Sequence, residues 1–146
     1  FDSSLKLFRP RLANGNWKSP FNPKARFFDI RWQGSGGHGY VEGDAWAYRY
    51  FVPHGQHKLI DLFGGPGPYI DTLQRLFDDG HYDMTNEPGL SFPYLFNYVK
   101  GEEWRTQKQV QDCIQRYFHT GPGGIPGNDD AGTMSAWLLF SMLGIY

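Results

Sequence analysis

The chain has 146 residues, the length of one ordinary domain, and its 14 basic and 15 acidic side chains nearly cancel in charge. A chain this close to neutral gives no sign of the basic face that binds a phosphate backbone, so we expect no nucleic-acid partner. The longest apolar stretch, residues 136–146, is shorter than the roughly 20 residues that cross a bilayer, so we expect no membrane partner either.

Residues 1–39 are dense in proline, glycine, asparagine and arginine and show no sustained periodicity, which predicts a long loop region. Scattered aromatic side chains can pin such a segment down, so we expect it to be ordered. Residue 1 is not methionine, and the chain stops directly after its most apolar stretch. We therefore expect residues 1–146 to be one segment of a larger catalytic domain, with its helices in residues 40–146.

From residue 40 onward, loops rich in glycine, proline, asparagine and aspartate alternate with apolar segments of helical length. The predicted helices cover residues 44–52, 56–62, 66–80, 92–99, 104–118 and 131–143. The fifth has Val110, Cys113 and Ile114 on one face and Gln109 on the other, which predicts one buried and one hydrated face. The sixth is apolar all round, which predicts burial on every side.

One-faced and fully buried helices alternate in a barrel of inner and outer helices. No run with the alternating periodicity of a strand follows residue 44, which weighs against an α/β fold. The sequence therefore predicts an all-α fold that forms part of an α/α barrel. Six or so helices cannot close a barrel of twelve, so we expect activity only as part of the full-length protein.

Three acidic clusters each lie directly before a predicted helix. They are Glu42-Gly43-Asp44, Asn86-Glu87-Pro88 and Gly127-Asn128-Asp129-Asp130. Capping of a helix explains any one of them, because Asp and Asn are favoured N-caps and Glu is favoured in a first turn. The three together favour a site, since the N-termini of barrel helices would gather them at one end.

Carboxyl groups in different environments can serve as the proton donor and the base of glycoside hydrolysis. Loops rich in carboxylate, amide and carbonyl oxygen also suit Ca²⁺. The motifs that other reactions need are incomplete in this sequence. The glycine-rich loops do not continue into a phosphate-binding motif, and no histidine pair has the spacing of a zinc peptidase. Cys113 is the only cysteine, which excludes an internal disulfide and a multi-cysteine zinc site.

A more specific resemblance rests on blocks of residues spread along the chain. They are Phe8-Arg9-Pro10, Gly15-Asn16-Trp17, Tyr40-Val41-Glu42-Gly43-Asp44-Ala45-Trp46, Phe51-Val52-Pro53-His54, Asn86-Glu87-Pro88 with Pro93-Tyr94-Leu95, and Gly124-Ile125-Pro126-Gly127-Asn128-Asp129-Asp130-Ala131-Gly132 with Met134-Ser135-Ala136-Trp137. In order and spacing these blocks resemble glycoside hydrolase family 92 over almost the entire chain. Two positions depart from the usual pattern: Asp44 stands where asparagine is common, and Gly89-Leu90 replaces a polar pair.

The resemblance implies an (α/α)6 catalytic barrel and an exo-acting α-mannosidase that inverts the anomeric centre. It also implies a calcium ion bound to the 2- and 3-hydroxyls of mannose. On that pattern Glu42 is the general acid and Asp130 the base that activates water. Asn128 and Asp129 flank Asp130 and would contact substrate or position the base or the water.

The same resemblance places Asn86 and Glu87 at positions that contact the sugar, with Glu87 also a candidate calcium ligand. Trp46 is a candidate for stacking on a sugar ring, with packing in the core as the alternative. The expected partners are α-mannose-containing oligosaccharides or glycoproteins, N-glycans among them, and the remainder of the polypeptide. By family the protein is expected to be secreted, extracellular or periplasmic.

Two other functions stay open at this point. The chain could belong to a carbohydrate-binding or inactive α/α-barrel domain that no longer hydrolyses its ligand. The presence of both Glu42 and Asp130 argues against it, because replacing either one with an amide is the simplest way to lose activity. It could also belong to another α/α-barrel hydrolase with a different sugar, which the calcium requirement would distinguish.

Overall fold

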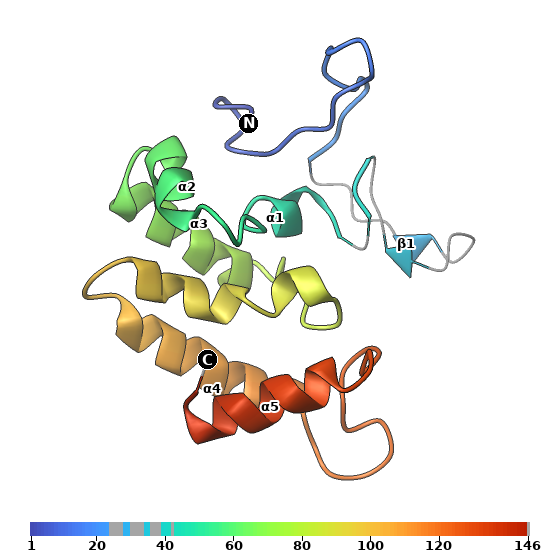
Figure 1. The fold of residues 1–146 in the computed structure, drawn as a ribbon, viewed down its shortest axis with the longest axis vertical. Coiled ribbons are helices and arrows are strands. Elements are labelled where there is room, and N and C mark those ends of the chain that lie inside the picture. The colour runs from blue at the N-terminus through green and yellow to red at the C-terminus, as the bar shows by residue number, and fades with distance from the viewer. Residues whose placement is uncertain (24–27, 30–33, 36–38, 42, 146) are drawn as a thin grey trace. The chain divides into compact units, whose positions relative to one another are not determined.

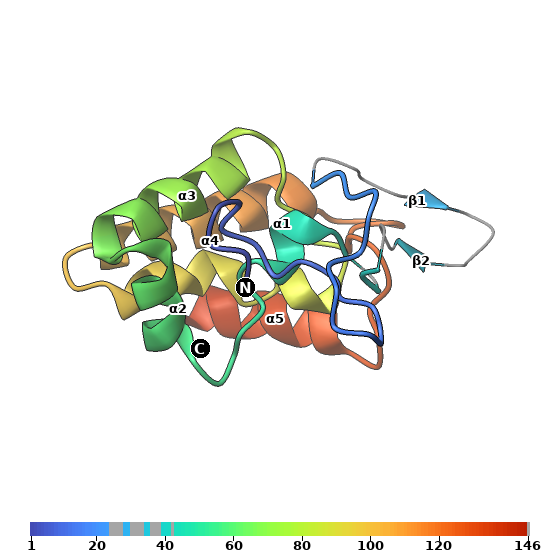
Figure 2. The same ribbon diagram turned by 90° about the horizontal axis from the view of Figure 1, so that it is seen from above.

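The computed structural model describes residues 1–23, 28–29, 34–35, 39–41 and 43–145. The chain divides into two compact units, Phe1–Tyr82 and Asp83–Tyr146. Figures 1 and 2 show the order of the elements along the chain. None of the helices in the described ranges combines the length and apolar character that a bilayer crossing requires.

The first unit begins with extended segments and continues into helices. Bridges join Asp2 to Leu7 and Arg11 to Trp17. The short strands β1 (Phe28–Asp29) and β2 (Gly34–Ser35) pair antiparallel, with Phe28 opposite Ser35. Helices α1 (Ala45–Tyr48), α2 (Gln56–Phe63) and α3 (Pro66–Asp78) follow. The helices predicted at 56–62 and 66–80 are confirmed, whereas the one predicted at 44–52 is only a single turn.

Helices α2 and α3 lie side by side in both views and share an aromatic core (Figures 1 and 2). The rings of Tyr50, Phe63 and Tyr69 pack together with centroids 5.6 to 6.0 Å apart. The buried amide of Gln56 donates to the Tyr50 carbonyl at 3.1 Å and accepts from the Tyr69 hydroxyl at 3.2 Å. Gly64 ends α2 with φ of +94°, a conformation that glycine adopts without strain, and the chain turns there into α3.

The second unit consists of helices and the loops between them. In chain order these are the 3₁₀ helices η2 (Glu87–Gly89) and η3 (Phe92–Tyr98), then α4 (Glu103–Tyr117) and α5 (Thr133–Leu143). Helix α4 packs against η3. The segments predicted at 92–99, 104–118 and 131–143 are all found within about two residues, a normal uncertainty for helix ends. Every described element longer than two residues is helical, so the all-α prediction is confirmed.

The buried face of α4 differs from the prediction. Thr106, Gln109 and Cys113 are buried, whereas Val110 and Ile114 are only half-buried. Gln109, which we expected on the hydrated face, is 5% exposed. Apolar periodicity misses this stripe because two of its three members carry polar groups.

Helix α5 is also less buried than its composition predicts. Met134 and Trp137 are the buried residues of this helix, but four large apolar side chains are roughly half or more exposed. They are Leu139 at 58%, Phe140 at 49%, Met142 at 68% and Leu143 at 61%. Within residues 1–146, only the face with Met134 and Trp137 is covered, so burial on every side is not reached by this part of the larger domain alone.

Candidate functional site

The first acidic cluster is shaped by a helix cap in the first unit. The Asp44 carboxylate accepts hydrogen bonds from the amides of Trp46 and Ala47 at 2.9 and 3.0 Å, so it caps α1. Just before it, the Tyr40 hydroxyl donates to the Phe8 carbonyl at 2.9 Å, and burial raises the pKa of Tyr40 to about 12. Asp44 thus has the structural role of an N-cap. Glu42, the predicted general acid, lies outside the described residues.

Trp46, predicted to stack on a sugar, already has ring and cation partners. Its indole lies nearly parallel to the His81 imidazole, with ring centroids 4.1 Å apart and planes at 5°. The Arg49 guanidinium lies 4.4 Å from the centroid of the same indole. At least one face of the ring is therefore occupied by the protein, and stacking on a sugar would need the other face.

The third cluster forms the loop that leads into α5, in the second unit. Asp130 is exposed and Asp129 half-buried, and Asn128 before them is exposed. Asp130 has φ of +46° and Ala131 has φ of +60°, a region that residues other than glycine seldom adopt. Strained backbone of this kind clusters at functional sites, where the surrounding structure holds it in place.

The second cluster meets the third. Glu87 begins η2 and is exposed, and the half-buried Asn86 precedes it. The Glu87 and Asp130 carboxyl groups form a side-chain hydrogen bond, although 42 residues separate them in sequence. The structure thus brings together Asp130, the predicted base, and Glu87, a predicted sugar or calcium contact. We refer to these two side chains as the acidic pair.

The acidic pair changes the acidity of Asp130. The hydrogen bond to Glu87 raises the pKa of Asp130 above its ordinary value of 3.8, and burial and the negative charges of Glu87 and Asp129 raise it further. The hydrogen bond acts in this direction because the protonated Asp130 can donate to the Glu87 carboxylate, which favours the neutral form. Asp130 is therefore a stronger base than an isolated aspartate.

Replacing Glu87 with glutamine is expected to lower the pKa of Asp130 toward its ordinary value, because the carboxylate that causes the shift is removed. The folded wild type keeps the Asp130 proton to higher pH than the unfolded chain does. The raised pKa of Asp130 therefore contributes fully to the free energy of unfolding below pH 3.8. This contribution is lost as the pH rises through the raised pKa. The measurement is a carbon-13 NMR titration of the Asp130 carboxyl in calcium-free buffer. Glu103→Gln on α4 is the control, and an unchanged Asp130 pKa in Glu87→Gln would contradict the prediction.

Three contacts link the segments around the acidic pair. The Trp137 indole N–H donates to the Leu90 carbonyl at 2.9 Å, which ties α5 to the segment that follows η2. The same indole lies against the Phe118 ring, with centroids 5.7 Å apart and planes at 8°. Gly127 approaches Thr85 so closely that a Cβ on Gly127 would lie 2.6 Å from the Thr85 carbonyl oxygen.

Replacing Trp137 with phenylalanine is expected to destabilise the fold by about 1 to 3 kcal/mol, because the Leu90 carbonyl loses its donor. Trp104→Phe is the matched control: that indole is 53% exposed, and its replacement should change stability by no more than about 0.5 kcal/mol. Urea denaturation measures both free energies of unfolding. Equal stability of the two variants would mean that the Trp137 hydrogen bond contributes nothing.

The sequence motifs include Gly127, Ser135 and Trp137 but do not predict that these residues fix this geometry. Leu90 acts only through its backbone carbonyl, which has no sequence signature. Ser135 contacts Asp129 from the first turn of α5, at a separation of six residues that capping patterns do not cover. Gly127 gives a weak signal, because glycine is used where a backbone must approach another group closely.

The oxygen chemistry of the acidic pair fits a hard cation such as calcium. Glu87 raises the pKa of the adjacent Asp130, and a nearby positive charge would stabilise this pair of carboxyl groups. The pair would supply part of a shell only, since Ca²⁺ takes six to eight oxygens. Across residues 1–23, 28–29, 34–35, 39–41 and 43–145, no three side chains of the His, Cys, Asp or Glu types are grouped as metal ligands.

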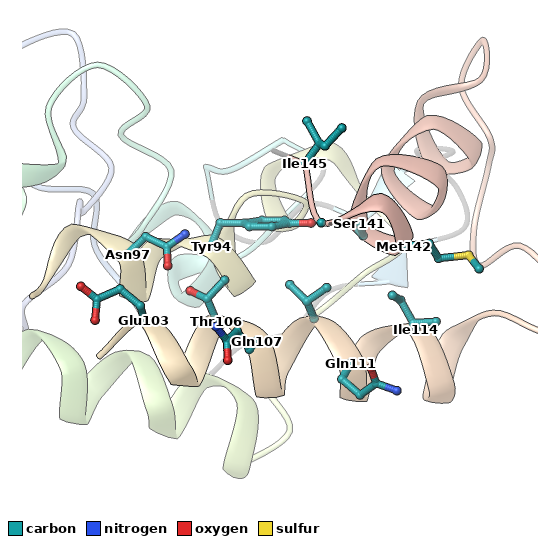
Figure 3. Close-up of a pocket in the computed structure, with 12 residues that line it drawn as sticks. Tyr94, Asn97, Glu103, Thr106, Gln107, Gln111, Ile114, Ser141, Met142 and Ile145 are labelled. Atoms are coloured by element: carbon teal, nitrogen blue, oxygen red, sulfur yellow. Dashed lines mark hydrogen bonds between the residues drawn. The ribbon is translucent and has the colours of Figure 1, made fainter. Parts of the chain in front are cut away.

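A groove of about 650 Å³ lies elsewhere in the second unit (Figure 3). It runs between η3, α4 and the C-terminal end of α5, and the Tyr94 hydroxyl meets the Ser141 hydroxyl at its edge. None of the predicted site residues lines it. The acidic pair lies near the opposite, N-terminal end of α5, so the chemistry expected from the sequence is not in this groove.

Comparisons with known proteins agree with the resemblance seen in the motifs. The glycosyl hydrolase family 92 catalytic domain matches residues 1–146. An uncharacterised secreted glycosidase of Arthroderma benhamiae is 31% identical over an alignment 144 residues long, and the alignment covers 96% of this chain and 18% of that protein. A family GH92 α-mannosidase of Bacteroides thetaiotaomicron, solved with mannoimidazole, is 30% identical with a TM-score of 0.78 over 95% of this chain and 20% of its own.

The chain therefore spans about a fifth of the length of either relative. The match is continuous from the first residue to the last and includes all three acidic clusters. Sequence motifs, helical fold and family comparison all lead to the same assignment. This chain belongs to the glycosyl hydrolase family 92 catalytic domain.

Proposed function

We propose that this chain is the part of an α-mannosidase that carries its catalytic carboxyl groups. Its family consists of glycosyl hydrolases, and the solved relative is an α-mannosidase in complex with mannoimidazole. The observation that carries the proposal is the acidic pair, in which Glu87 raises the pKa of the exposed Asp130. A carboxylate with increased proton affinity at the start of a helix is suited to accept a proton from water.

The proposed reaction is exo-acting hydrolysis with inversion. Asp130 takes a proton from a water molecule as the water oxygen attacks the anomeric carbon. Glu42 gives its proton to the glycosidic oxygen as the bond from that oxygen to the anomeric carbon breaks. An inverting enzyme needs its two carboxyl groups about 6.5 to 9.5 Å apart, with the water between the base and the sugar.

Asn86, Glu87, Asn128 and Asp129 border Asp130 in sequence or in space and are the proposed contacts for the sugar and the water. Glu87 is also the proposed calcium ligand, with the ion holding sugar hydroxyls when bound. The fit rests on the oxygen chemistry of the acidic pair. Trp46 is retained as a sugar contact through whichever indole face His81 and Arg49 leave accessible.

The proposed substrates are oligosaccharides or glycoproteins with terminal α-mannose, N-glycans included. Secretion is proposed because the fungal relative is described as a secreted glycosidase. Activity is expected only in a polypeptide longer than residues 1–146. The support for this is that the chain corresponds to 18% and 20% of the two relatives.

The test is mannose release from a panel of α-linked mannobioses by the longest polypeptide that carries these residues. Samples with and without a calcium chelator are compared, and NMR identifies the anomer of the first-formed product. Release of β-mannose that chelation abolishes and calcium restores would support every part of the proposal. An α product or release that ignores the chelator would overturn inversion or calcium dependence, and binding without release would favour a carbohydrate-binding domain.

A further inference from the structure

The loop before α5 holds three successive residues in the left-handed region. Asp130, Ala131 and Gly132 have φ of +46°, +60° and +93°. Only the third is a glycine, so two of the three positions are strained for the residues they hold. A strained run like this persists only where neighbouring groups fix it. The direction of the Asp130 carboxyl group depends on this run, because the run sets the backbone from which the side chain leaves.

The first turn of α5 supplies the groups that fix the run. One oxygen of the Asp129 carboxylate accepts from the Ser135 amide at 2.8 Å and from the Ser135 hydroxyl at 3.0 Å. The Met134 amide donates to the Asp129 carbonyl at 3.3 Å, and the Thr133 hydroxyl donates to the Asp130 carbonyl at 2.8 Å. Residues 129 and 130 are therefore tied to three consecutive residues of the helix.

Ser135 makes the only side-chain contact to Asp129 among these ties. Changing the Ser135 side chain removes its hydroxyl contact and leaves the backbone amides of the helix in place. Helix α5 itself is held by the buried Met134 in its first turn and by the hydrogen bond from Trp137 to the Leu90 carbonyl. The Asp129 carboxylate is thus attached to a helix that is anchored to the segment following Glu87.

We propose that Ser135 is a positioning residue for Asp130, acting through the Asp129 carboxylate. The Ser135 hydroxyl holds Asp129, Asp129 fixes the left-handed run, and the run directs the Asp130 carboxyl group toward Glu87. The proposal deepens the proposed function and rests on it, since it takes Asp130 to be the base. It also gives Asp129 a structural role beside its proposed contact with the sugar or the water.

The kinetic test compares Ser135→Ala with Ser135→Thr in the longest polypeptide that carries these residues. A misplacement of about 1 Å in a catalytic group can cost about 100-fold in rate. We therefore expect Ser135→Ala to lower kcat about 10- to 100-fold with KM nearly unchanged, and Ser135→Thr, which keeps the hydroxyl, to restore kcat. Ser141→Ala at the other end of α5 is the matched control and should leave kcat and KM as they are.

A double-mutant cycle tests the route through Asp129. If Ser135 acts through Asp129, then Ser135→Ala, Asp129→Ala and the double variant lose similar amounts of activity. Losses that multiply in the double variant would overturn that route. A wild-type kcat in Ser135→Ala would overturn the proposal altogether, and so would a loss that threonine fails to restore.

A crystal structure of Ser135→Ala gives a readout that does not depend on activity. The expected result is that Asp130 leaves the left-handed region and its carboxyl group moves away from Glu87. An unchanged acidic pair in that structure would overturn the positioning role. A wild type that hydrolyses no α-mannoside would instead overturn the proposed function, with the structural result still deciding what Ser135 does.

Discussion

Replacement of Asp130 by asparagine is expected to lower the rate of mannoside hydrolysis by about 10²- to 10⁴-fold, the contribution typical of a general base. Asparagine has nearly the same size and can still accept a hydrogen bond, but its amide cannot take a proton from water. The measurement is kcat with an α-mannoside substrate. KM should change much less than kcat, because binding of the sugar does not require the transfer of that proton.

The control is Asp112→Asn on α4. Asp112 is an exposed carboxylate paired with Lys108 at 2.6 Å, one helical turn away, and such a pair contributes little to stability. Its replacement should leave kcat within about twofold of wild type, as expected for a surface substitution. Full activity of Asp130→Asn would remove Asp130 as the base and would direct attention to Asp129.

Substrates with different leaving groups separate the proposed base from the proposed acid. A nitrophenolate departs without protonation, so a nitrophenyl mannoside should restore much of the activity that Glu42→Gln loses on a mannobiose. The same substrate should not rescue Asp130→Asn, because the water must be activated whatever group leaves. Equal rescue of both variants would contradict the two assigned roles.

The helices of this chain were predictable from the sequence wherever local signals punctuate them. Gly64 and Pro66 mark the end of α2 and the start of α3, and the predicted and observed bounds agree there. The helix expected from residue 44 is shorter, because the Tyr50 amide bonds to the Ala47 carbonyl in a tighter turn and the chain then leaves the helix. Pro53 predicts that the helix stops near residue 52, but the observed helix already ends at Tyr48.

Burial was harder to predict because it depends on what covers each face. Gln109 is buried in spite of its amide, and Phe140 is half exposed in spite of its ring. Composition and periodicity describe the helix alone. They do not say whether another element lies against a particular face.

The sequence predicts the candidate site as a set of residue types, and it predicts only part of the geometry of that site. Acidic clusters before helices pointed to Glu87 and Asp130, and these two side chains do meet in the structure. Their meeting depends on a backbone carbonyl at Leu90, a ring at Trp137 and a missing Cβ at Gly127. These are tertiary contacts between segments about 40 residues apart, and no local pattern encodes them.

Gly127 is the position where a single methyl group should separate the acidic pair. An alanine there would need φ of +62°, and its Cβ would lie 2.6 Å from the Thr85 carbonyl oxygen and 2.8 Å from the Thr85 Cβ. The strained backbone alone costs about 1 to 2 kcal/mol. Relieving the overlap costs about 1 to 3 kcal/mol more, because a backbone segment has to move. We therefore expect Gly127→Ala to destabilise the fold by about 2 to 5 kcal/mol.

Gly123→Ala distinguishes the two causes of destabilisation, which are backbone strain and overlap with Thr85. Gly123 lies in the same loop with φ of +77°, but a Cβ there would have no heavy atom within 4 Å, so only the strain of about 1 to 2 kcal/mol applies. Urea denaturation of both variants measures the difference in the free energy of unfolding, which is the cost of overlap with Thr85.

If the overlap is relieved by moving the loop away from Thr85, Asp130 moves away from Glu87 and the pKa of Asp130 falls toward 3.8. Equal destabilisation by the two alanines, with the Asp130 pKa still raised in Gly127→Ala, would show that the approach of Gly127 to Thr85 does not hold the acidic pair together.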